Sequence, residues 1–261
     1  MKKAIFRFIS GSFALLAFTG FIAAAPSAVF QAAGPNAASI QGSVDQFRAA
    51  LGGVNNGNAP GPIATGRREI NWDGGGSTAI SIGATPFDGF LNIRGGRFVT
   101  DGAGFLQAPA SGLAEFFGNP TYASIFSSFS PVRLFTPIGS NHTEAQFFLP
   151  GSNGGVEAST RGFGVVFTDV DKGGQQSPFR PCNTCTVVEF LAADGSVLYS
   201  SPAPAAPGNG SLSFLGVIFD DAHIARVRIT AGSAAAGPSE FDFLDVVMMD
   251  DFIYGEPQPL P

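Results

Sequence analysis

The chain is short of lysine, of tryptophan and tyrosine, and of charged residues in general. Its 261 residues include 1 Trp, 3 Tyr and three lysines, which are Lys2, Lys3 and Lys172. Charged residues make up 13% of the chain, about half the share usual in globular proteins. A coiled coil or a long helical bundle is excluded, because both need many Glu, Lys and Leu residues. The net charge of −6 argues against nucleic acid as a partner, since nucleic-acid-binding proteins are normally basic.

Phenylalanine, glycine and proline are by contrast abundant, at 27, 35 and 19 residues. So much aromatic surface argues against a disordered chain. Abundant Gly, Phe and Val with few helix formers favour an all-β protein. The Phe side chains are expected to fill the gap of about 10 Å between two packed sheets, and a Phe-lined ligand groove is the alternative.

The N-terminus has the pattern of a secretory signal peptide, assigned to residues 1–25. Lys2, Lys3 and Arg7 precede an apolar stretch over residues 13–22 that ends in three alanines. A membrane anchor is the alternative, but the stretch is shorter than the roughly 20 residues of a span. Cleavage would remove three positive charges and no negative ones, which takes the formal charge from −6 to −9. We expect a secreted or extracellular product, or one held in the periplasm, with no membrane span.

The rest of the chain divides by composition into three parts. Residues 26–63 are rich in Ala, Gly and Pro, and are expected to be flexible except for a short helix capped by Ser43. Residues 64–257 contain the predicted β-domain, and residues 258–261 form a tail.

Short apolar runs separated by turn residues begin at Arg67 and predict about a dozen strands. Alternation supports half-buried strands. Near residue 227, Val227 and Ile229 point to one face, while Arg226 and Arg228 point to the other. No segment between the strands reads as a crossover helix, so a parallel sheet is not expected. The pattern predicts one antiparallel β-sandwich of jelly-roll type.

Several motifs of this region together resemble a known group of proteins. They are Arg68-Glu69-Ile70-Asn71-Trp72-Asp73-Gly74, Phe147-Phe148-Leu149-Pro150-Gly151, Gly162-Phe163-Gly164-Val165-Val166-Phe167, Ser213-Phe214-Leu215-Gly216-Val217 and Asp250-Asp251-Phe252-Ile253-Tyr254-Gly255. The chain is similar to an uncharacterised family of secreted bacterial β-sandwich proteins, like the ectodomains found before PEP-CTERM sorting tails. The resemblance implies a fold and an extracellular setting, but no established activity. The chain ends at Pro261 without a hydrophobic tail, so we expect free secretion.

Acidic residues concentrate near the C-terminus, where eight of the twenty Asp and Glu residues fall within 220–256. Calcium prefers six to eight oxygen ligands, often from several carboxylates. A jelly roll commonly brings its first and last strands together, so Asp169, Asp171, Asp250 and Asp251 are candidate ligands of a structural calcium ion. The alternative is that they are ordinary solvated acids or partners of arginine.

Cys182 and Cys185 form the only cysteine pair, separated by two residues. A redox motif of this spacing normally opens a helix, whereas this one leads into a predicted strand. In an exported chain a local disulfide that pins the loop is the favoured interpretation. Free thiols, a redox role and a metal site remain alternatives.

Three kinds of function remain open. A carbohydrate-binding module usually presents Trp or Tyr as a stacking platform, and Trp72 beside Asp73 could flank such a face unless it belongs to the core. A polysaccharide hydrolase or lyase would need two converging acids, for which Glu69, Glu144 and Glu189 are candidates. His142 and His223 belong to no nucleophile motif. We therefore expect a noncatalytic binding or structural domain of the cell envelope or matrix, stabilised by calcium. Its candidate partner is a polysaccharide or a cell-surface component.

Overall fold

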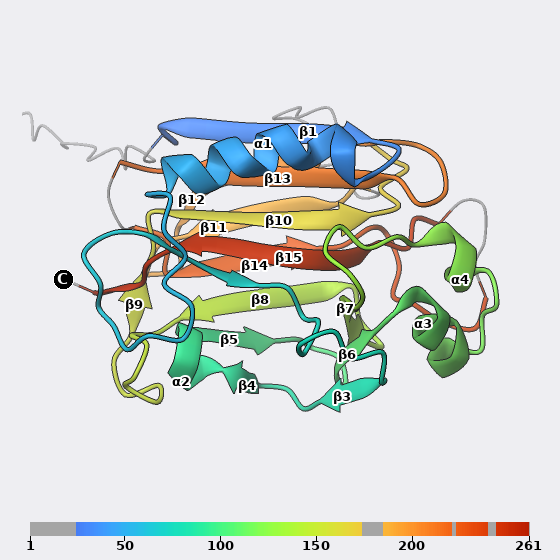
Figure 1. Cartoon of the computed structure of the whole chain (residues 1–261), viewed down its shortest axis with the longest axis horizontal. Helices are drawn as coiled ribbons and strands as arrows, with labels where there is room; N and C mark the ends of the chain where they lie inside the picture. Colours follow the sequence, from blue (N-terminus) through green and yellow to red (C-terminus); the bar gives the residue numbers. More distant parts are fainter. Residues whose placement is uncertain (1–24, 174–184, 221–222, 240–243, 261) are drawn as a thin grey trace, which may run out of the picture.

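The computed structural model describes residues 25–173, 185–220, 223–239 and 244–260. Two antiparallel sheets pack face to face (Figure 1). The first sheet runs in the order β1 (Ala28–Gly34), β13 (Leu212–Ile218), β10 (Gly162–Thr168), β15 (Met248–Gly255), β7 (Leu134–Ile138), β6 (Gly104–Ala108) and β3 (Ser81–Gly83), with β2 (Arg67–Ile70) also paired to β15. The second runs β12 (Val197–Pro202), β11 (Val187–Leu191), β14 (Arg226–Thr230), β8 (His142–Phe147), β5 (Gly96–Val99) and β4 (Phe87–Phe90).

This architecture confirms the predicted all-β class and the antiparallel sandwich, while the jelly-roll winding stays a prediction. The short helices α2 (Leu91–Arg94), α3 (Ala110–Phe117) and α4 (Tyr122–Ile125) lie in the connections. A further small sheet joins β16 (Gln258–Pro259) to β9 (Ala158–Ser159). The segment predicted as a tail, 258–261, is thus paired over its first two residues, because its backbone meets that of β9.

The space between the sheets is filled mainly by phenylalanine, as the sequence predicts. Phe163 and Phe252 enter it from the first sheet, and Phe98 and Phe190 enter it from the second. All four are 0 or 1% exposed. Most of the rings meet edge-on or tilted, such as Phe163 and Phe252 at 5.4 Å between centroids, which is a geometry that aromatic pairs prefer.

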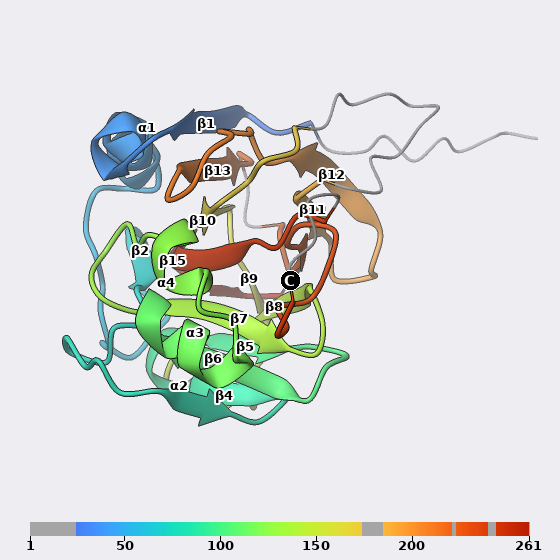
Figure 2. The ribbon, with the colours of Figure 1, turned by 90° about the vertical axis from the view of Figure 1, so that its right-hand side faces the viewer.

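Part of the other face of the first sheet is covered by α1 (Ala37–Ala50), which lies alongside β1 and β13 (Figures 1 and 2). The helix is capped by Asn36, whose side chain accepts a hydrogen bond from the backbone N–H of Ser39. The ring of Phe47 lies against Gly164 and Gly216, where a Cβ atom would come within 2.7 and 2.8 Å of it. Glycine in these two strands therefore makes room for the helix.

Composition predicted a flexible segment outside the sandwich over residues 26–63, but residues 28–50 are part of the sandwich. Ala28–Gly34 pairs with β13 over seven residues, and Ile40, Val44 and Phe47 of the helix are fully buried. The helix also starts before the predicted cap, Ser43. The Ala-rich sequence fits a strand because small side chains suffice at a sheet edge that a helix covers.

Strand β15, which lies in the middle of the first sheet, contains a β-bulge at Asp250 and Asp251. Val165 pairs with Phe252 and Phe167 pairs with Met249, so two residues of β15 lie opposite Val166 alone. Met249 and Phe252 both belong to the core between the sheets. The extra residue lets Asp250 and Asp251 both point away from that core, toward α1 and the segment before β7.

No helix in the described ranges is both long and apolar enough to cross a membrane. The predicted signal peptide, residues 1–25, lies outside the described residues apart from Ala25.

Candidate functional site

A row of charged side chains crosses the outer face of the second sheet. Strand pairing places Glu144 of β8 opposite Arg228 of β14, and Arg228 opposite Glu189 of β11. The Arg228 guanidinium lies 3.7 Å from a Glu144 oxygen and 3.4 Å from a Glu189 oxygen. The predicted alternation explains this row, because Val227 and Ile229 are buried while Arg226 and Arg228 are exposed.

Beside this row the face is hollowed into an open depression of about 390 Å³. It lies over the ends of β5, β8 and β14, and Asp101, His142, Glu144, Arg228 and Thr230 are among its lining residues. A second cavity, near Arg226, measures only about 40 Å³, little more than one water molecule occupies. The depression has the size of a small ligand site.

The depression is edged by a pair of exposed polar side chains. His142 Nδ1 lies 3.5 Å from an Asp101 oxygen, and the Ser140 hydroxyl donates a hydrogen bond to the same carboxylate. The Ser140 hydroxyl, and then the neighbouring His142, hold the pKa of Asp101 below its usual range. Asp101 therefore presents an ionised acceptor, and Arg228 presents donors, on one open surface.

The glutamates considered as catalytic candidates lie in two places. Glu144 and Glu189 lie on either side of Arg228 and are both ion-paired to it. Glu69 lies elsewhere, on the outer face of the first sheet, where its carboxylate contacts Arg48 at 2.8 Å. Of the three glutamates proposed as catalytic candidates, Glu144 and Glu189 therefore share one guanidinium, whereas Glu69 lies apart from them. His223 does not line the depression.

The four predicted calcium ligands fall into two separate places. Thr168 pairs with Met248, so Asp169 lies beside residue 247, three positions from Asp250. At about 3.4 Å per residue, Asp169 and Asp250 are roughly 10 Å apart along the strand. Asp171 instead lies near Asp245, whose carboxylate accepts a hydrogen bond from the Asp171 backbone N–H at 3.4 Å. Burial raises the pKa of Asp245 to about 6.

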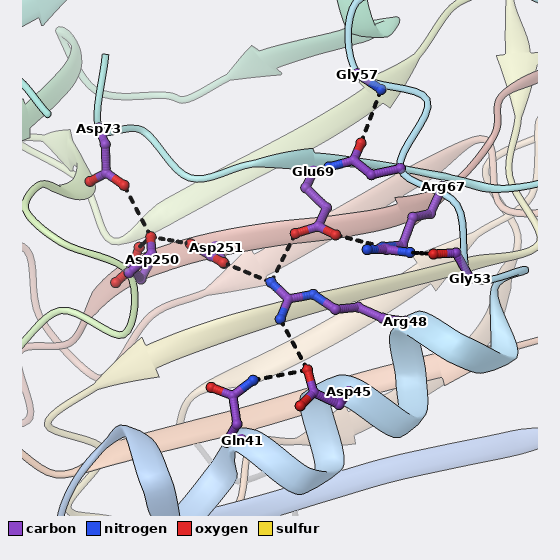
Figure 3. A network of polar contacts seen from close by, with 12 residues as sticks. Gln41, Asp45, Arg48, Gly53, Gly57, Arg67, Glu69, Asp73, Asp250 and Asp251 are labelled. Carbon is purple, nitrogen blue, oxygen red and sulfur yellow. Dashed lines mark hydrogen bonds and ion pairs between the residues drawn. The ribbon is translucent and has the colours of Figure 1, made fainter. Parts of the chain in front are cut away.

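Asp250 and Asp251 belong to a polar network that ties α1 to the first sheet (Figure 3). The Arg48 guanidinium lies 3.4 Å from an Asp251 oxygen, and Arg48 also contacts Glu69 of β2. Arg67 contacts the other oxygen of Glu69 at 2.5 Å. Within the described residues no group of three or more Asp, Glu, His or Cys side chains is arranged to hold a metal ion. Asp169, Asp171, Asp250 and Asp251 thus do not form one calcium site, because the β-bulge turns the last two toward α1.

The proposed ligand-binding pair Trp72 and Asp73 is buried, at 1 and 3% exposure, and does not face solvent. The Trp72 ring stacks on Phe135 at 3.7 Å, and its N–H donates to the backbone carbonyl of Asp250 at 3.0 Å. An indole in this position cannot serve as a platform for sugar, so the core interpretation is correct. Asp73 instead accepts a hydrogen bond from the backbone N–H of Arg133.

Cys185 is buried at the start of the segment that leads into β11. Cys182 lies outside the described residues, so the disulfide between the two stays a prediction.

Comparison of the chain with protein-family models, curated proteins and solved structures returned no significant match. The resemblance to secreted bacterial β-sandwich proteins therefore stays a prediction, and the site must be interpreted from its own chemistry.

Asp101, Arg228 and Thr230 are the site residues that sequence reasoning missed. One signal was present, since the alternation near residue 227 already placed Arg226 and Arg228 on a solvent-facing side. No such signal pointed to Asp101. This residue follows β5 in a turn, and it reaches His142 only because β5 pairs with β8.

Proposed function

We propose that this protein is a noncatalytic extracellular binding domain that recognises a carbohydrate on the outer face of its second sheet. The observation that carries the proposal is the open depression, which is lined by both hydrogen-bond donors and acceptors. Sugar hydroxyls donate and accept at once, so a face with Arg228, Asp101, Glu144 and Thr230 complements them. Secretion and the role at the cell envelope are part of the same proposal and rest on the N-terminal sequence.

The charges around the depression narrow the class of carbohydrate. Asp101 and Glu144 supply two carboxylates, whereas the one arginine that lines it, Arg228, is shared with Glu189. An anionic polysaccharide would meet repulsion there, so the proposed ligand is a neutral or amino sugar chain. Because the described tryptophan and most phenylalanines are buried, hydrogen bonds rather than ring stacking would supply the affinity.

Replacing Arg228 with alanine is expected to weaken glycan binding by about 10- to 100-fold, since charge-assisted hydrogen bonds contribute about 1.5–3 kcal/mol. The measurement is a glycan array of neutral, amino and acidic polysaccharides, followed by titration calorimetry on the best ligand. Arg226→Ala is the matched control, because Arg226 lies two residues away on the same face but does not line the depression.

Equal losses in the two variants would place the ligand elsewhere on the protein. An array without signal for any polysaccharide, from protein with a normal melting transition, would refute carbohydrate binding and leave a structural role.

A further inference from the structure

Three buried carboxylates, those of Asp73, Asp250 and Asp251, lie close together (Figure 3), and we call them the aspartate cluster. All three lie near the hydroxyl of Ser130. The Ser130 Oγ lies 3.2 Å from an Asp73 oxygen, 3.4 Å from an Asp250 oxygen and 2.5 Å from an Asp251 oxygen. The three residues are at most 3% exposed. A hydroxyl carries a single proton, so Ser130 can donate to only one of the three.

The backbone around the cluster supplies two further donors. The N–H of Phe129 donates to Asp250 at 2.6 Å, and the N–H of Arg133 donates to Asp73 at 2.9 Å. The Arg133 guanidinium points elsewhere, with a long contact to the Ala79 carbonyl. Neutral donors of this kind soften the repulsion between carboxylates but do not cancel their charge.

Arg48 of α1 is the cation in direct contact with the cluster in the described part of the chain, at 3.4 Å from Asp251. The same guanidinium is shared with Glu69 at 2.8 Å and with Asp45 at 3.3 Å. Arg67 neutralises Glu69 from the other side. The charges on β2, α1 and β15 therefore leave the buried cluster with an excess of negative charge, which is costly away from water.

We propose that the folded protein holds one proton between the carboxyl groups of Asp250 and Asp251, and that this proton makes the fold more stable in acid than in alkali. The β-bulge in β15 is the structural cause, because it places two consecutive aspartates on the same side of the strand. Both carboxylates have an oxygen within 3.4 Å of the same Ser130 hydroxyl, so they cannot both ionise freely. One proton between them replaces a repulsion with a hydrogen bond.

The surroundings of the two carboxyl groups support the proposal. Burial, and then the neighbouring Asp251 carboxylate, raise the pKa of Asp250 well above its usual range. Burial also raises the pKa of Asp251, against the opposing effects of Ser130 and Arg48. Since the two groups interact, the proton belongs to the pair rather than to one residue.

The sign of the pH dependence follows from these raised pKa values. The stabilising effect is complete below the pKa of an unfolded aspartate, about 3.9, and is lost as the pH rises through the folded-state pKa. Over the range in which the folded protein holds one extra proton, the folding constant should fall about tenfold per pH unit.

The decisive variant is Asp250→Asn, because asparagine has the shape of a protonated aspartate and can accept from Phe129 while donating to Asp251. Thermal and urea unfolding are measured from about pH 4 to about pH 9. We expect the variant to melt about 2–4 °C above the natural protein at the alkaline end and to lose the alkaline part of the pH slope.

Asp245→Asn is the matched control, since Asp245 is a buried aspartate outside the cluster whose pKa is raised to about 6. This variant should change the pH dependence of the unfolding free energy only near and below about pH 6. Parallel profiles for the natural protein and Asp250→Asn would overturn the proposal.

A second measurement uses the natural protein, so it does not depend on whether the variant folds. Carbon-13 NMR of labelled aspartate carboxyls should show one resonance that stays in the neutral position at pH values near 7. Three ionised carboxylates in the cluster would overturn the proposal. A rise in melting temperature with added calcium that Asp250→Asn abolishes would also overturn it, by assigning the neutralising role to a cation. The cluster and the depression lie on different sheets, so failure of either proposal leaves the other intact.

Discussion

Replacing Arg68 with alanine is expected to lower the free energy of unfolding by about 3–5 kcal/mol, the cost of leaving one member of a buried ion pair alone. Arg68 is fully buried, and its guanidinium meets both oxygens of Glu256 at 2.6 Å. It also donates to the backbone carbonyl of Gly57 at 2.7 Å. Its removal would strand the Glu256 carboxylate, which is 5% exposed, and would release the loop that begins near Gly57.

Urea denaturation checks this result, with Arg97→Ala as the control. Arg97 also meets both oxygens of a carboxylate, that of Asp88, at 2.7 and 3.0 Å, but the pair is exposed. Exposed pairs contribute about 0–1 kcal/mol, so the two arginines should differ several-fold in their effect. Equal losses would show that the burial of Arg68 does not determine its contribution.

Replacing Trp72 with alanine is expected to destabilise the protein by about 3–5 kcal/mol, because it removes a large buried ring and leaves a cavity. The indole touches Phe135, Phe98 and Phe252, with centroids 3.7, 5.1 and 5.1 Å away. The substitution also leaves the Asp250 carbonyl without its hydrogen-bond donor. The loss should appear in urea unfolding, whereas Val197→Ala, at an exposed edge position, should stay within about 0.5 kcal/mol of the natural protein.

The same variant separates the core interpretation of Trp72 from a ligand-binding one. Because the ring lies between the sheets, the fraction of Trp72→Ala that folds should bind glycan with unchanged affinity. A normal stability with lost binding would contradict the structure and restore Trp72 as a binding residue.

Much of the strand pattern could be predicted because it depends on local chemistry. Alternation placed Val227 and Ile229 inside and Arg226 and Arg228 outside, and the pleat of a strand enforces that order. The bulge in β15 could not be predicted, since it arises from the pairing of β15 with β10. Strict alternation would have sent Asp250 and Asp251 to opposite faces.

The sequence by itself determined the class of the protein: an all-β chain, with a Phe-rich core and few charges. These properties follow from composition and from periods of two residues, which any fold of the chain must respect. Only the tertiary structure decided which polar residues meet. Arg68 and Glu256 are 188 positions apart, Arg48 and Asp251 are 203 apart, and no local pattern links either pair. Their meeting depends on strand order, so Asp251 and Glu256 of the acidic C-terminal segment became part of buried ion pairs rather than of a solvated surface.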